Sequence, residues 1–97
     1  MMQDYSEKRD FRRMTVETAI TLIAMDSAQE WHGTCLDLSA TGMLVNVGYA
    51  IPLETELRTR MAGGTPDAKP LETQARVIRH LERDGHILLG LETLKML

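Results

Sequence analysis

The chain has 97 residues, which is enough for one domain with a single hydrophobic core. Hydrophobic residues make up 43% and aromatic residues only 4%, so we expect an aliphatic core in which methionine fills the gaps. The net charge of -3 argues against a general nucleic-acid-binding protein. The charge is uneven, because residues 1–13 hold four basic and three acidic side chains and the remainder carries -4. A local basic cluster of this kind suits a small anion better than a long polyanion.

Cysteine, histidine and hydropathy patterns exclude further classes of protein. Cys35 is the only cysteine, which excludes an internal disulfide and a cysteine-based zinc site, and its apolar context predicts a buried structural thiol. The three histidines have no acidic or cysteine partner at metal-ligand spacing, so we expect no metal site; they are His32, His80 and His86. Without a membrane-length apolar run or a signal-peptide pattern, we expect a cytoplasmic protein with no membrane insertion.

Residues 1–13 lack apolar periodicity, so we predict a flexible N-terminal arm ahead of one folded domain that spans residues 14–97. Beyond the arm, alternating apolar and polar positions rich in β-branched residues predict strands. The predicted strands cover residues 14–25, 31–38, 43–47, 53–61, 69–82 and 86–92.

The pattern is clearest in the second half of the chain. Over residues 53–61, Leu, Thr, Leu, Thr and Met alternate with Glu and Arg, which predicts a half-buried strand with a solvated outer face. The pair Asp84-Gly85 lies between two apolar runs and predicts a tight β-hairpin. Residues 93–97 are too few to assign to a helix or to a strand.

Five or six antiparallel strands at short spacing, with no helix longer than a turn or two, predict an all-β fold. A flat sheet of this size would expose one hydrophobic face and two open edges. We therefore predict a closed or nearly closed small β-barrel with little or no C-terminal helix.

The polar cluster at residues 37–42 lies between two predicted strands and reads as a kink or tight turn. As a structural feature, it needs only the local hydrogen bonds of Asp37 and Ser39 and the dihedral freedom of Gly42. As a functional feature, Asp37 and Ser39 are two residues apart on a strand and face the same side. A carboxylate there can accept two N–H bonds from one planar group, such as the Watson–Crick edge of guanine.

A basic cluster lies just before the first predicted strand, where Lys8, Arg9, Arg12 and Arg13 surround the aromatic Phe11. The cluster is either a solvated patch or an anion clamp. Arginine suits a clamp, because its guanidinium group makes bidentate bonds to phosphate and also stacks on bases.

Taken together, Arg9-x-x-x-Arg13 and Asp37-x-Ser39-x-x-Gly42, on an all-β chain of this length, resemble the PilZ domain family. The resemblance covers almost the whole chain and implies a six-stranded antiparallel β-barrel receptor for the bacterial second messenger cyclic di-GMP. It implies that Arg9 and Arg13 hold phosphates and stack on guanine. Asp37 and Ser39 would contact a guanine edge and a nearby phosphate, and Gly42 would keep the turn open.

The resemblance also bears on two further basic residues and on how ligand binding is signalled to a partner. Arg12 is a further candidate phosphate contact, and the residue at the Lys8 position influences whether one ligand molecule or a stacked pair binds. Closure of the arginine-bearing arm over the ligand would change the surface offered to a downstream protein partner. The chain lacks a clear C-terminal helix, in contrast to longer relatives, which leaves its mode of output open.

Several other side chains have simpler interpretations. Arg76, Arg79 and His80 could line the pocket from a neighbouring strand, but solvated positions are the favoured interpretation. Trp31 is expected to pack against the barrel. Ser39 has no histidine nearby in sequence to act as a base, so we expect no catalysis and no cofactor.

Two alternatives remain. One is a PilZ-like protein-interaction module without nucleotide binding, against which the intact arginine and Asp-x-Ser motifs argue. The other is a small barrel for single-stranded nucleic acid, which would require several aromatic platforms and a basic groove. One Trp, two Tyr and one Phe on an acidic chain make that alternative poor, so we expect no nucleic-acid partner.

Overall fold

The computed structural model describes residues 14–62 and 69–97, and these residues form six strands and no helix. The strands are β1 (Met14–Ala24), β2 (Glu30–Leu38), β3 (Gly42–Asn46), β4 (Glu56–Met61), β5 (Leu71–Arg83) and β6 (His86–Met96). The predicted arm at residues 1–13 lies outside the described residues, so its flexibility and its separation from the barrel stay predictions.

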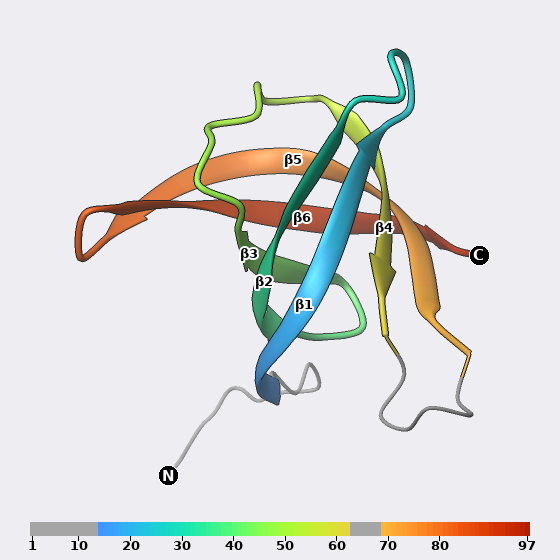
Figure 1. Ribbon diagram of the computed structural model, residues 1–97, viewed down its shortest axis with the longest axis horizontal. Helices are drawn as coiled ribbons and strands as arrows, with labels where there is room; N and C mark the ends of the chain where they lie inside the picture. Colours follow the sequence, from blue (N-terminus) through green and yellow to red (C-terminus); the bar gives the residue numbers. More distant parts are fainter. Residues whose placement is uncertain (1–13, 63–68) are drawn as a thin grey trace, which may run out of the picture.

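The six strands close into a barrel in the order β1-β2-β3-β6-β5-β4, and every neighbouring pair is antiparallel. In Figure 1, β1 and β2 run steeply through the picture while β5 and β6 cross them nearly horizontally, as expected for a small barrel with strongly tilted strands. The predicted all-β, six-stranded antiparallel barrel without a C-terminal helix is therefore confirmed. Closure also pairs the edges that a flat sheet would leave open.

The barrel interior is aliphatic, as the composition predicted. The buried cluster consists mainly of Ile20, Leu22, Ala24, Cys35, Met43, Val45, Ile51, Leu57, Met61, Ala75, Val77, Leu89 and Leu91. Trp31 is partly buried against this cluster and stacks on Tyr49 with ring centroids 6.0 Å apart, which confirms its packing role. Within the described residues, no helix is long and apolar enough to span a bilayer.

Strand β4 confirms the alternation predicted for residues 53–61, but it does not begin where the sequence predicted. Its residues alternate between exposed and buried, with Leu57, Thr59 and Met61 facing inward. The prediction that the strand begins at Leu53 is wrong, because Leu53 is 52% exposed and Glu54 has a φ of 72°. Both the backbone N–H and the hydroxyl of Thr55 donate to the carbonyl oxygen of Pro52, so these residues form a turn before the strand.

The hairpin predicted at Asp84-Gly85 is present, with φ values of 52° and 80° at these two residues. Two consecutive positive φ values are the mark of the type I′ turn, whose twist matches that of antiparallel strands. Strand β6 runs on to Met96, which pairs with Thr73 of β5. The segment that the sequence left unassigned is thus mostly strand, and the strand end predicted at residue 92 is wrong.

Candidate functional site

The turn between β2 and β3 is held by its own hydrogen bonds. The Ser39 backbone N–H donates to the Gly42 carbonyl at 2.9 Å, and the Ser39 hydroxyl donates to the same oxygen at 3.3 Å. The Thr41 backbone N–H donates to Ser39 Oγ at 3.3 Å. The Thr93 backbone N–H donates to the Thr41 carbonyl at 2.9 Å, which fastens the turn to β6. The expected tight turn is therefore present, and its position is fixed relative to the barrel.

Gly42 is required for a different reason from the one predicted. Among the described glycines only Gly48 and Gly85 have positive φ, so the expectation that Gly42 supplies unusual dihedrals is wrong. A Cβ at Gly42 would overlap the backbone carbonyl oxygen of Leu91. The glycine therefore permits the close approach of β3 to β6 beneath the turn.

A β-bulge controls the direction of Asp37. Cys35 pairs with Val45 and Asp37 pairs with Leu44, so β2 contains one extra residue, Leu36, opposite β3. Regular alternation would put Asp37 on the inward side with Cys35. The bulge breaks that alternation, so that Cys35 is fully buried while Asp37 is partly exposed and lines a pocket.

Cys35 is the buried structural thiol that the sequence predicted. Its Sγ donates a weak hydrogen bond to the Asp37 carbonyl oxygen at 3.4 Å. Burial, followed by the nearby charge of Asp37, raises the pKa of the Cys35 thiol to about 11. The thiol is therefore neutral at physiological pH and contributes packing rather than chemistry.

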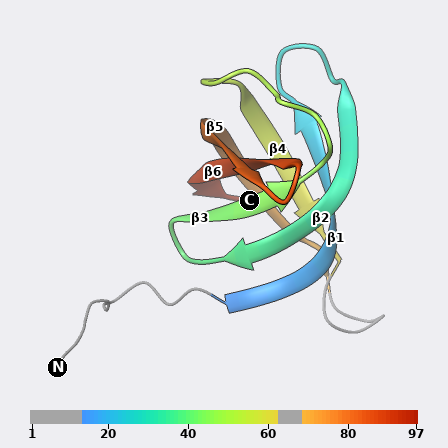
Figure 2. The same cartoon turned by 90° about the vertical axis from the view of Figure 1, so that its left-hand side faces the viewer.

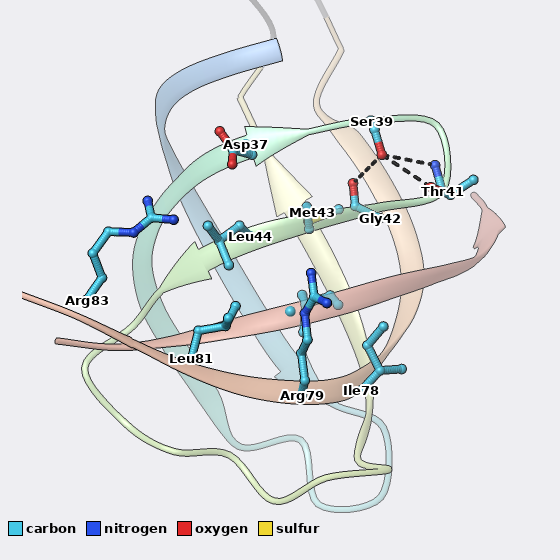
Figure 3. Close-up of a pocket in the computed structure, with 12 residues that line it drawn as sticks. Asp37, Ser39, Thr41, Gly42, Met43, Leu44, Ile78, Arg79, Leu81 and Arg83 are labelled. Atoms are coloured by element: carbon cyan, nitrogen blue, oxygen red, sulfur yellow. Dashed lines mark hydrogen bonds between the residues drawn. The ribbon is translucent and has the colours of Figure 1, made fainter. Parts of the chain in front are cut away.

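The pocket beside Asp37 has a volume of about 330 Å³ and joins parts of the chain that are distant in sequence. Asp37 and Ser39 line it from one side and Arg79 and Arg83 from the other, with apolar residues between them (Figure 3). The complete lining is Asp37, Ser39, Thr41, Gly42, Met43, Leu44, Ile78, Arg79, Leu81, Arg83, Gly90 and Leu91. A mixed surface with one carboxylate, hydroxyls and two guanidinium groups suits a ligand with hydrogen-bonding bases and negative charge.

The structure brings Asp37, Ser39 and Gly42 together at this pocket. The other predicted ligand residues are Lys8, Arg9, Arg12 and Arg13, and they lie outside the described residues. Met14 pairs with Leu38 and Thr15 pairs with Asp37, so the start of β1 lies beside the end of β2 (Figure 2) and next to the pocket residue Asp37. The contacts assigned to the basic cluster stay predictions.

Arg79 and Arg83 line the pocket although neither belongs to a sequence motif. Arg79 is exposed, as expected, but it also lines the pocket, which was the less favoured interpretation, and no role in the pocket was predicted for Arg83. Arg79, Leu81 and Arg83 alternate along β5, and this period-two pattern was the available signal. This pattern alone could not place the two arginines at the pocket, because the register of β5 against β6 shifts between Val77 and Arg79.

Arg76 and His80 do not line this pocket. The guanidinium group of Arg76 lies 3.0 Å from Glu92 and 3.8 Å from Glu54, in ion pairs across neighbouring strands. His80 Nε2 lies 2.6 Å from the carbonyl oxygen of Ile51. No group of three potential metal-ligating side chains occurs in residues 14–62 and 69–97.

Comparison with known proteins identifies the family. The PilZ domain family matches residues 7–96 of the chain. No curated protein matches the sequence significantly.

Three solved structures share the fold. The inhibitor of motility of Bacillus subtilis (MotI/DgrA) has a TM-score of 0.77 at 18% identity, covering 95% of this chain and 45% of that protein. The PilZ domain of CeSA from a cellulose-synthesizing bacterium has a TM-score of 0.68 at 21% identity, covering 86% and 80%. The PilZ domain of YcgR from Escherichia coli, solved with c-di-GMP, has a TM-score of 0.71 at 17% identity, covering 91% and 79%.

This chain thus spans less than half the length of the B. subtilis protein and most of the length of the other two domains. Because the sequence identities are only 17–21%, the structural likeness shows a shared fold and nothing more. The family match includes all six strands and both sequence motifs, so this chain belongs to the PilZ domain family.

Proposed function

We propose that this PilZ domain is a receptor for cyclic di-GMP and that the ligand binds in the pocket beside Asp37. The observation that carries the proposal is the convergence on one pocket of Asp37, Ser39 and Gly42, the residues of the Asp-x-Ser motif. The solved PilZ domain of YcgR with c-di-GMP supports this choice of ligand. The proposal assigns no catalytic role to the chain.

Base identity follows from the chemistry of Asp37. Guanine presents two adjacent N–H donors on its Watson–Crick edge, and a carboxylate accepts both with its two oxygens. Adenine lacks this donor pair, so the same carboxylate faces an acceptor. Ser39 lies beside Asp37 in the pocket lining, and its hydroxyl can donate to a nearby phosphate oxygen in place of the Gly42 carbonyl oxygen.

Arg9 and Arg13 supply the phosphate and base-stacking contacts in this proposal. Arg13 directly precedes Met14, whose pairing with Leu38 puts the start of β1 next to Asp37. Four residues extend at most about 14 Å, so Arg9 is also within reach of the pocket. A guanidinium group can make bidentate bonds to phosphate and stack on a purine, which are the two interactions that a cyclic dinucleotide requires.

Output is proposed to come from ordering of the arginine-bearing segment. Fixing about five residues over the ligand costs roughly 5–10 kcal/mol of backbone entropy, which lowers the observed affinity below the sum of the contacts. In exchange, binding changes the surface that the barrel offers to a downstream protein partner.

Limited trypsin digestion tests this step: cleavage after residues 8, 9, 12 and 13 should slow with cyclic di-GMP, while cleavage after Lys95 should not. Equal cutting at saturation would contradict an ordering mechanism.

Calorimetric titration with cyclic di-GMP tests the assignment of the ligand itself. GTP and a single-stranded oligonucleotide are the controls, because GTP shares the guanine and phosphates and the oligonucleotide shares the polyanionic backbone. We expect saturable binding of cyclic di-GMP alone. No heat of binding with cyclic di-GMP would leave a protein-interaction barrel as the better assignment, and equal binding of the oligonucleotide would favour a nucleic-acid-binding barrel.

A further inference from the structure

The five arginines in the described residues divide into two groups. Arg58, Arg60 and Arg76 each have a carboxylate within 4.0 Å, from Glu72, Glu54 or Glu92. Arg79 and Arg83, the two that line the pocket, have no carboxylate partner among residues 14–62 and 69–97. On an acidic chain, cations without acidic partners at a pocket are available to an anion from solution.

The conformation of Arg79 has a specific structural cause. Arg79 pairs with Gly90 across the β5–β6 ladder. A Cβ at Gly90 would come within 2.8 Å of Arg79 Cγ and 3.0 Å of Arg79 Nε. The stem of Arg79 therefore lies over the bare backbone of Gly90, and Figure 3 shows the side chain extending from β5 across β6 towards the pocket. Any larger residue at position 90 would move that guanidinium group.

Arg83 reaches the same pocket from the end of the hairpin. Arg79, Leu81 and Arg83 share one face of β5, so the two guanidinium groups flank a leucine along the pocket wall. This wall is opposite Asp37 and Ser39 in Figure 3. With Asp37 as the only carboxylate among the described lining residues, the lining carries a net positive charge.

We infer that Arg79 and Arg83 form a second phosphate-binding wall of the site, held in position by Gly90. The inference rests on the proposed function and extends it. A cyclic dinucleotide has two phosphodiesters on opposite edges of its ring, and cations from residues 8–13 alone would approach from the side where β1 begins. Arg79 and Arg83 engage the second phosphodiester from β5, with bidentate geometry that a lysine does not reproduce.

Calorimetry with cyclic di-GMP on single variants tests the wall. Arg79→Gln and Arg83→Gln should each weaken binding by about tenfold or more, because each removes a charge-assisted bond to phosphate. Arg79→Lys should recover part of the loss. The matched control is Arg58→Gln, which removes the same charge from the outer face of β4 and should leave the affinity unchanged. The two pocket variants should also show a smaller dependence of affinity on salt concentration than the wild-type chain.

A double-mutant cycle tests the role of Gly90. Gly90→Ala should weaken binding in the wild-type background and add little in the Arg79→Gln background, because its effect acts through the displaced arginine. Equal effects in both backgrounds would contradict the positioning role.

The outcomes separate the two claims. If Arg79→Gln and Arg83→Gln bind cyclic di-GMP with the same affinity as Arg58→Gln, the second wall is overturned and the proposed function stands. A wild-type chain that does not bind cyclic di-GMP would overturn both.

Discussion

The direction of the Asp37 side chain depends on one extra residue in β2. The bulge at Leu36 separates the sides occupied by Cys35 and Asp37, although the two positions are two apart and strict alternation would put them together. Sequence reasoning correctly grouped Asp37 with Ser39 at a turn. It could not predict the bulge, because an extra residue in a strand has no signal in the hydrophobic pattern of that strand alone.

Replacement of Asp37 by alanine should reduce base selectivity as well as affinity. A carboxylate that reads the guanine edge discriminates between bases by about 1–3 kcal/mol, so the preference for cyclic di-GMP over cyclic di-AMP should fall by about tenfold or more. Competition binding with both dinucleotides measures this ratio. Asp26→Ala is the matched control, since it removes an exposed carboxylate from the turn after β1. An equal loss for both ligands would reduce Asp37 to a turn former.

Gly42→Ala should destabilise the barrel by about 1–3 kcal/mol, because its Cβ would overlap the Leu91 carbonyl and push β3 away from β6. Gly42→Val should not be milder, since the clash already occurs at the first side-chain carbon. Gly85→Asn is a suitable control, because position 85 is open and asparagine tolerates positive φ. Thermal melts compare the three variants, and a wild-type melting temperature for Gly42→Ala would contradict the close approach.

Cys35 should make stability depend on pH in the alkaline range. The pKa of the thiol rises from 9.0 in its ordinary state to about 11 in the fold. The folded chain therefore keeps a proton that the unfolded chain loses, and stability falls as pH rises from about 9 to 11. The loss is on the order of 2 kcal/mol. Chemical denaturation of Cys35→Ser should lack this component of the pH dependence, and identical slopes in both proteins would show that the thiol does not contribute.

At the scale of elements, β4 and β5 are joined by a buried polar contact. The hydroxyls of Thr59 and Thr73 lie 2.7 Å apart in directly paired positions, and both side chains are buried. The alternation in residues 53–61 predicted that Thr59 faces inward. It could not predict the partner, because a cross-strand pair depends on register.

This pair gives a test of element packing. Thr59→Val should cost about 1–3 kcal/mol, because it leaves the Thr73 hydroxyl buried without its partner. The double variant Thr59→Val with Thr73→Val should be closer to wild type, since both polar groups are then gone. Urea denaturation of the two single variants and the double variant checks the expectation, and additive losses would rule out a coupled pair.

The elements were largely predictable where local chemistry determines them. The hairpin at Asp84-Gly85 follows from the two positive φ values that this pair accommodates. The start of β4 was misplaced because apolar Leu53 continued the alternation on a segment whose backbone forms a turn. The end of β6 was missed because residues 93–96 gain their strand conformation from pairing with β5.

At the scale of the whole molecule, barrel closure assembles the candidate site. Strand β3 pairs with β6, which brings the turn after β2 next to Glu92 and Thr93 of β6, about fifty residues later in the chain. The strand pattern and the family resemblance were sufficient to predict the fold, and the Asp-x-Ser motif predicted one side of the pocket. The opposite side, with Arg79 and Arg83, depends on register and on the bare backbone of Gly90, neither of which a motif specifies.

The location of the ligand is the central claim, and an NMR titration tests it most directly. Backbone amide shifts of the ¹⁵N-labelled chain should be recorded as cyclic di-GMP is added to saturation. We predict that the largest changes occur at residues 37–42 and 79–83, the two sides of the pocket, while residues 25–29 after β1 stay unchanged. Shifts concentrated at residues 25–29, or no shifts at saturating cyclic di-GMP, would contradict the account.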